Sequence, residues 1–282
     1  MAFRARDLVL LDGPMGTELT ARGVTTELPA WSAAALDEAP EVVAEIHRDY
    51  VDAGATVHTA NTFRTQPGIV PDRWAVLARR AVRLARAVVP AGQRVAGSIA
   101  PIADCYRPDR SPGEAARGAH RALCRVLADA GADLLLCETF PSVPEAWVAV
   151  EEAVATGLPT WLSLTAGPSA DLLAPDAVRR GAEGAVARGA SAVLINCVPA
   201  VDTLRFVEAI ADLGVPFGAY ANAGSPDARI GWAASAEPGA EAYAELAEGW
   251  VAAGATLIGG CCGTGPAHLR ALRGRFGGGQ LR

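Results

Sequence analysis

Short apolar runs alternate with amphipathic stretches along the whole chain of 282 residues. Most of these runs are continuous in Val, Leu, Ile and Ala, a pattern typical of parallel strands that are covered on both faces. Each run therefore predicts one strand. The eight predicted strands are 8–11, 56–60, 94–99, 134–137, 160–165, 192–197, 215–219 and 256–260.

Between these runs, apolar residues recur at helical spacing. Residues 74–85 carry them at i, i+3, i+4, i+7, i+8 and i+11, and residues 143–154 and 178–186 show similar stripes. A glycine in an AGA or RGA triplet precedes four of the strands, where it suits the left-handed cap of a helix.

Eight strand–helix units predict an α/β fold, a single (β/α)8 TIM barrel over residues 1–276, followed by a disordered tail at 277–282. A doubly wound sheet is the alternative, but the GxGxxG turn expected after its first strand is missing.

Composition narrows the chemistry. All 25 cationic side chains are Arg, so Schiff-base, PLP and Walker A mechanisms, which need a lysine, are excluded. A net charge of −6 argues against nucleic-acid binding, and no apolar run reaches the ~20 residues of a membrane span. The N-terminal apolar stretch is too short for a secretory signal, so we expect a cytoplasmic protein with reduced cysteines.

Polar residues at the carboxyl ends of the strands are the candidates for function, because these ends form the active face of a barrel. They include Asp12, Asn61, Glu138, Asn222 and, on two strands, cysteines. Glu138 closes an apolar strand and therefore needs a partner. A ligand ammonium and a neighbouring Arg are equally compatible with the sequence.

Three cysteines fall at the ends of the sixth and eighth predicted strands: Cys197, Cys261 and Cys262. Neighbouring residues of a regular strand face opposite ways, so only a distorted, Gly-rich strand end brings Cys261 and Cys262 into one site. Three thiolates without a fourth protein ligand describe an open Zn²⁺ site, whose remaining position is left for a substrate thiol.

Other interpretations of the cysteines and histidines stay open here. Cys197 alone suits a buried apolar position, and Cys261–Cys262 suits a vicinal disulfide or inert core. Cys124 and Cys137 are interpreted as core, whereas Cys105 is left unassigned. The four histidines do not cluster: His58 is expected in the core, and the helical His47, His120 and His268 are expected on the surface.

Seven segments resemble the homocysteine S-methyltransferase family over nearly the whole chain. They are LLDGPMGTEL (10–19), HTANTF (58–63), GSIAPIADCYRPD (97–109), GADLLLCETF (131–140), LINCVP (194–199), AYANAG (219–224) and GATLIGGCCGTGPAHLRAL (254–272). The ordered NC and GGCCG pair is the most specific of these motifs.

The resemblance implies a zinc-dependent barrel in which Cys197, Cys261 and Cys262 bind the metal and the homocysteine thiol takes the fourth place. It implies that Glu138 holds the amino group of homocysteine, that Asp12 and Gly13 lie beside the amino acid, and that Asn61 and Asn222 surround the site. The segment 97–109 departs from the family pattern and contains Cys105. Around it no aromatic cage for a cationic donor is evident beyond Tyr106.

Three functions remain in view. The first is transfer of a methyl group from a sulfonium donor, S-methylmethionine or S-adenosylmethionine, to homocysteine to form methionine. The second is methylation of a different thiol in secondary metabolism. The third is a non-catalytic homocysteine-binding module that serves a separate methyl-carrying protein.

Overall fold

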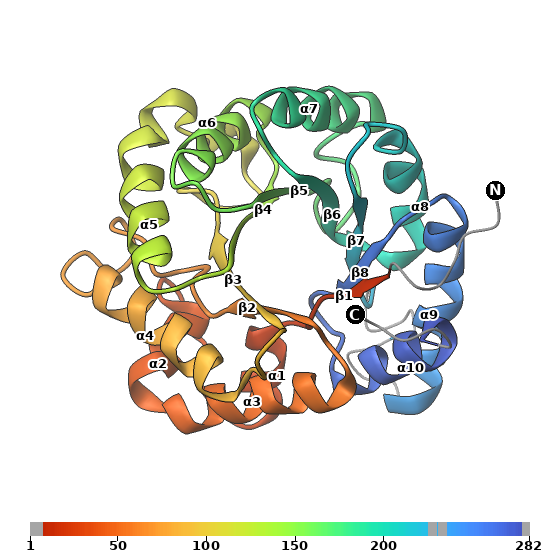
Figure 1. Cartoon of the computed structure of the whole chain (residues 1–282), viewed down its shortest axis with the longest axis horizontal. Coiled ribbons are helices and arrows are strands. Elements are labelled where there is room, and N and C mark those ends of the chain that lie inside the picture. Colours follow the sequence, from red (N-terminus) through yellow and green to blue (C-terminus); the bar gives the residue numbers. More distant parts are fainter. Residues whose placement is uncertain (1–7, 225–229, 231–235, 278–282) are drawn as a thin grey trace.

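Eight parallel strands form a ring at the centre of the molecule, and helices surround it (Figure 1). The computed structural model describes residues 8–224, 230 and 236–277. The predicted (β/α)8 barrel is therefore confirmed. The strands are β1 (Val9–Leu10), β2 (Val57–Ala60), β3 (Arg94–Ile99), β4 (Leu134–Phe140), β5 (Thr160–Leu164), β6 (Ala192–Pro199), β7 (Phe217–Asn222) and β8 (Leu257–Gly260).

The helices follow the strands in alternation, and the first strand is followed by an additional helical excursion. The α-helices are α1 (Met15–Ala21), α2 (Ala35–Glu38), α3 (Pro40–Ala53), α4 (Trp74–Val88), α5 (Arg117–Asp129), α6 (Val143–Val154), α7 (Pro175–Ala187), α8 (Ala200–Ala209), α9 (Ala236–Ala252) and α10 (Pro266–Phe276). Short 3₁₀ helices are η2 (Trp31–Ala34), η3 (Pro108–Arg110) and η4 (Gly113–Ala116). Apart from Gly277, the tail expected at 277–282 lies outside the described residues.

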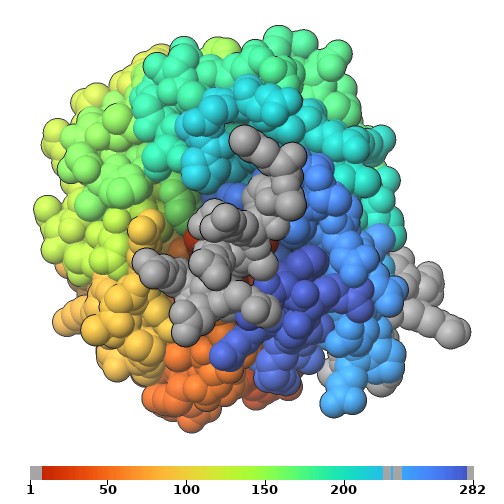
Figure 2. Space-filling model, turned by 45° about the vertical axis from the view of Figure 1, so that its right-hand side comes forward, coloured from red at the N-terminus to blue at the C-terminus, as the bar shows by residue number. Residues whose placement is uncertain are grey.

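The ring closes where the first strand meets the second and the last. β1 pairs with β8 through Val9 and Leu257, and Leu11 forms a bridge with Val57 of β2. The C-terminal helix α10 packs against α3, so an early and a late segment of the described chain lie side by side (Figure 2). The barrel is therefore nearly closed, with β1 and β2 joined through the bridge between Leu11 and Val57.

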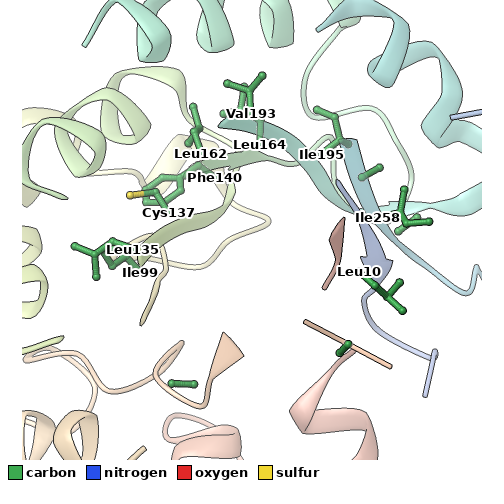
Figure 3. Packing of buried hydrophobic residues seen from close by; sticks show 14 of the residues in the cluster. Leu10, Ile99, Leu135, Cys137, Phe140, Leu162, Leu164, Val193, Ile195 and Ile258 are labelled. Atoms are coloured by element: carbon green, nitrogen blue, oxygen red, sulfur yellow. The ribbon is translucent and has the colours of Figure 1, made fainter. Parts of the chain in front are cut away.

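Each strand presents one side to the helices and the other to the barrel interior. The outward side chains, such as Leu135, Leu162 and Ile258, pack against the helical layer (Figure 3). The inward ones form a second, smaller cluster that includes Leu134, Leu194 and Leu257. Because both faces are covered by apolar groups, the strands read as continuous apolar runs.

The predicted glycine caps before four of the strands are present in the structure. The glycines that precede β2, β4, β6 and β8 all adopt positive φ, between 91° and 105°, as the predicted left-handed caps require.

The surface placement of three histidines is wrong, because His47, His120 and His268 are all buried. Helical spacing shows which residues share a face of a helix, but it does not show whether the face that carries a histidine is buried against another element. His58 is buried as expected and contacts Gln93 at 2.7 Å.

Candidate metal and substrate site

A cavity of about 370 Å³ opens at the carboxyl ends of the barrel strands. Its size falls in the range of small-molecule sites. Seven of the eight predicted site residues line it: Asp12, Gly13, Asn61, Glu138, Cys197, Cys261 and Cys262. The eighth, Asn222, is buried at the end of β7 but is not part of the lining.

Three cysteine sulfurs meet at the floor of this cavity. The Sγ atoms of Cys197, Cys261 and Cys262, called here the sulfur cluster, all lie within 4.8 Å of one another, and all three thiols are free. The Sγ atoms of Cys197 and Cys261 are 2.8 Å apart. The fold therefore brings together thiols that are 64 residues apart in the sequence.

A bulge near the end of β6 turns Cys197 into the cavity. Ile195 and Val198 both pack outward, so the two residues between them both turn toward the barrel interior. The register against β7 shifts between Asn196 and Pro199, and Cys197 has a φ of 52°. In a regular strand Cys197 would share the outward face of Ile195 and would be lost from the site.

Cys261 and Cys262 lie in the turn after β8, beyond the last strand residue, Gly260. Thr264 fixes this turn by donating its hydroxyl to the carbonyl of Cys261 at 2.7 Å, and Gly263 has a φ of 79°. A Cβ on Gly260 would collide with the side chain of Thr264. The glycines therefore permit the sharp turn that aims two adjacent cysteines into one site, as the sequence predicted.

The donor set fits a soft metal ion. Tetrahedral Zn–S bonds of about 2.3 Å place sulfurs about 3.8 Å apart, within the span of the sulfur cluster. Hydrogen bonding to Cys261, neighbouring sulfur and burial raise the pKa of the Cys197 thiol, whereas bonds from Cys197 and Cys261 hold the pKa of Cys262 well below its usual range. Three adjacent thiols thus resist full ionisation, and a bound cation would remove that penalty.

Glu138 is buried beside the sulfur cluster and has no cationic partner among the described residues. Its carboxyl group accepts hydrogen bonds from the hydroxyls of Ser98 and, at 2.9 Å, Tyr220. Burial raises the pKa of Glu138 in spite of these two bonds. Among the described residues no Arg pairs with Glu138, so the alternative of a neighbouring Arg is wrong there.

The first strand contributes a second buried carboxyl group. Asp12 accepts the backbone N–H of Thr59 at 2.8 Å, and burial raises the pKa of its carboxyl well above the usual range. Gly13 must lack a side chain, because a Cβ there would lie 2.6 Å from the hydroxyl of Tyr50. Asn61 is held by a hydrogen bond from Ser32 to its Oδ1 at 2.7 Å.

A second bulge, in β4, mirrors the one in β6. Cys137 and Phe140 both pack outward, so Glu138 and Thr139 both line the cavity, and Thr139 has a φ of 61°. Asn196 of β6 connects the two bulges. Its Oδ1 accepts the N–H of Thr139 at 3.1 Å, and its Nδ2 donates to the Thr139 hydroxyl at 2.7 Å.

Aromatic side chains line the cavity more extensively than the sequence indicated. Trp31, Phe63 and Tyr220 join Tyr106 there, and the rings of Trp31 and Phe63 meet edge to face with centroids 6.0 Å apart. The nearby Cys197 and burial raise the pKa of Tyr106 well above its usual range. These rings come from separate segments of the chain, so no local sequence motif predicted that they would lie together.

The remaining cysteines divide as follows. Cys124 and Cys137 are fully buried in the core between strands and helices, as predicted. Cys105, which the sequence left unassigned, lines the cavity from the β3–α5 segment. Burial raises the pKa of the Cys105 thiol to about 12, opposed by the nearby guanidinium of Arg64.

The family model for homocysteine S-methyltransferase matches residues 9–276. The chain belongs to the homocysteine S-methyltransferase family. The match spans every described strand of the barrel, including the β6 bulge that carries Cys197, and the turn that carries Cys261 and Cys262. Members of this family are methyl-transferring enzymes, and the predicted family resemblance is confirmed.

Individual relatives are similar over almost their whole length. A homocysteine S-methyltransferase of Escherichia coli K12 is 34% identical, with 96% of each chain covered, and a selenocysteine Se-methyltransferase of Brassica oleracea is 28% identical, with 95% of this chain and 88% of the relative covered. The solved structure of the Escherichia coli homocysteine methyltransferase MmuM in its metallated form has a TM-score of 0.79 at 30% identity, over 95% of this chain and 96% of that one.

Proposed function

We propose that this protein is a zinc-dependent S-methyltransferase that moves a methyl group from a sulfonium donor, S-methylmethionine or S-adenosylmethionine, to the thiol of homocysteine. The observation that supports it is one cavity in which a three-thiol cluster lies beside a buried carboxyl group without a counter-ion. The proposed catalytic unit is the barrel, residues 1–276. Its six free cysteines suit the reducing cytoplasm.

Cys197, Cys261 and Cys262 would hold the zinc. When bound, zinc supplies a positive charge that stabilises the thiolate form of a substrate thiol at neutral pH. Because the protein offers three ligands, the site would leave room for the acceptor sulfur, and the same three side chains would decide where that sulfur lies. A nucleophile placed in this way needs no general base from the protein.

Glu138 orients the acceptor. Its carboxylate is already held by Ser98 and Tyr220, so it meets the ammonium group of homocysteine without losing side-chain freedom. Asp12 and Gly13 would line the amino-acid end on the β1 side together with Asn61, whereas Asn222 would act from outside the cavity lining. Burial raises the pKa of Glu138, and the ammonium group would favour its ionised form, because a nearby cation offsets the cost of desolvating the carboxylate.

The aromatic side chains suit the donor. Trp31, Phe63 and Tyr106 present ring surfaces to the cavity, and ring faces attract a sulfonium cation as they attract an ammonium. They also exclude water from the methyl group during its transfer. Direct in-line displacement requires only that acceptor sulfur, methyl carbon and leaving sulfur are aligned.

The test is methionine formation by reduced, zinc-loaded protein from homocysteine and each sulfonium donor, with no second protein added. Cys261→Ala and Cys262→Ala should each lose most bound zinc and methionine formation, whereas Cys124→Ala, a core variant, should keep its zinc. Binding of zinc and homocysteine without turnover would instead favour a module for a separate methyl-carrying protein. Turnover only with another thiol or selenol would change the acceptor.

A further inference from the structure

Among the described residues that line the cavity, Arg64 is the one with a cationic side chain. Its buried Nε has no hydrogen-bond partner among the residues that the structure describes, and none of their ion pairs involves its guanidinium group. Its guanidinium lies over the ring of Phe63, 5.6 Å from the centroid. A guanidinium group that faces a cavity and has no ion-pair partner is available to an anionic ligand.

The backbone around Arg64 is fixed on both sides. Thr62 donates its hydroxyl to the carbonyl of Ser98 at 2.8 Å. Gln66 donates its amide to the carbonyls of Ala100 and Pro101, both at 3.1 Å. The side chain is therefore presented to the cavity from a segment anchored to the end of β3, which lowers the entropy lost on binding a ligand.

The cavity carries its opposite charges on different segments. Asp12 and Glu138 are contributed by β1–α1 and β4 and form no ion pair with Arg64, which belongs to the β2–α4 connection next to Cys105 and the aromatic rings. An acceptor whose sulfur lies at the sulfur cluster and whose ammonium meets Glu138 would contact residues of β4, β6 and the turn after β8, whereas Arg64 belongs to a different segment. In-line displacement then requires the donor to extend away from the sulfur cluster, with its methyl group foremost.

We propose that Arg64 binds the carboxylate of the methyl donor, so that the site selects sulfonium donors that carry a carboxylate group. This inference rests on the proposed methyl transfer and adds the group by which the donor is recognised. Arg64 pairs with the donor carboxylate in a fork of two N–H···O bonds, while the aromatic rings cover the sulfonium. Arg64 is a specificity residue and takes no part in the bond changes.

Equilibrium binding tests this recognition without turnover. Donor affinity is measured by calorimetry on the zinc-loaded protein without homocysteine, for S-methylmethionine and for its carboxamide analogue, which has the same shape but no carboxylate charge. The protein should bind S-methylmethionine about 10- to 100-fold more tightly than the carboxamide, as expected for a charge-assisted pair. Arg64→Gln should bring the two affinities within about twofold of one another, and Arg64→Lys should restore part of the difference.

Arg83→Gln, on the exposed side of α4, is the matched control and should preserve the full preference. Zinc content and the KM for homocysteine should be unchanged in Arg64→Gln. Three results would overturn the inference. The unaltered protein could bind both donors equally, the preference could persist in Arg64→Gln, or no donor binding could be measurable. Selective donor binding without any methionine formation would instead overturn the proposed function and leave the carboxylate site standing.

Discussion

Glu138 illustrates how far one position in the sequence determines its own chemistry. A carboxylate that ends the apolar run LLLCE is costly to bury without a partner, and this cost alone marks it as a candidate. In the structure, two hydroxyl donors, Ser98 and Tyr220, contact Glu138 in place of the Arg that was one of its two possible partners. Those donors come from β3 and β7, so sequence reasoning had no means of naming them.

Removing the charge of Glu138 should weaken acceptor binding. Glu138→Gln keeps the shape of the side chain but removes the partner of the homocysteine ammonium. We expect homocysteine affinity to fall by roughly 1.5–3 kcal/mol, about 10- to 150-fold. Calorimetry on zinc-loaded protein measures this change, and metal analysis should show the zinc content unaltered.

Glu114→Gln serves as the comparison, because Glu114 lies on the exposed surface in η4. It should leave homocysteine affinity unchanged. If Glu138→Gln binds homocysteine as tightly as the unaltered protein, the ammonium is held elsewhere and the role of Glu138 is wrong.

At the level of strands and helices, the sequence predicted the eight strands and the helices α4, α6 and α7, but not the two irregularities that build the site. Continuous apolar runs predicted the strands because both barrel faces are covered. The bulges at Thr139 and Cys197 leave no such trace, since the register shift depends on the neighbouring strands. The sequence therefore placed Cys197 at a strand end without explaining why it faces inward.

Asn196 should stabilise both bulges at once. Its amide bonds to Thr139 and accepts the Ser163 hydroxyl at 2.8 Å, all in the buried interior. Asn196→Ala leaves these groups without partners, so we expect a loss of about 2–3 kcal/mol in the free energy of unfolding. Urea unfolding measures the loss, and zinc and homocysteine affinity should fall together because Cys197 and Glu138 lie beside the two bulges.

Ser191→Ala tests the opposite end of the same strand. Ser191 donates to the carbonyl of Thr160 at 3.1 Å in an exposed position, so its loss should cost at most about 0.5 kcal/mol. Equal effects of the two variants would show that Asn196 contributes no more than an ordinary surface hydrogen bond.

The β3–α5 segment, which carries Cys105 and Tyr106, is anchored by a buried carboxylate. Glu145 of α6 accepts the N–H of Ile102 at 2.8 Å and the Ser111 hydroxyl at 2.5 Å, and His120 lies 3.3 Å from it. Burial alone would raise the pKa of Glu145, but these partners lower it below its ordinary value. The anchor therefore depends on the ionised form.

This lowered pKa predicts how stability varies with pH. A depressed pKa in the folded state stabilises the protein above the unfolded pKa of about 4.3, and the contribution disappears as pH falls through the lower folded value. Glu145→Gln should lose about 1–3 kcal/mol at pH 7, and the difference from the unaltered protein should shrink steadily below pH 4. Urea unfolding at several pH values measures it, with the exposed Glu183→Gln as control.

At the scale of the whole molecule, closure of the barrel depends on contacts between residues that lie far apart in the sequence. Length and strand count predicted a closed ring, whereas the pairing of β1 with β8 and the packing of α10 on α3 join residues more than 200 positions apart. Such long-range contacts follow from the topology and not from local sequence. The aromatic lining was missed for the same reason, since Trp31 and Phe63 reach the cavity from the connections after β1 and β2.

Gly218 lies where β7 and β8 approach each other in this ring. A Cβ at this position would collide with the backbone carbonyl of Leu257, an atom that cannot move without breaking the β7–β8 pairing. Gly218→Ala should therefore lower the free energy of unfolding by about 3 kcal/mol or more, in the range of severe overpacking. Gly118→Ala is the matched control, because nothing lies within 4 Å of a Cβ there on the exposed side of α5. Helix propensity predicts that this control gains about 0.5 kcal/mol. Thermal and urea unfolding of both variants decide the matter, and a Gly218→Ala protein as stable as the Gly118→Ala protein would mean that the barrel tolerates a wider spacing of its last two strands than the structure shows.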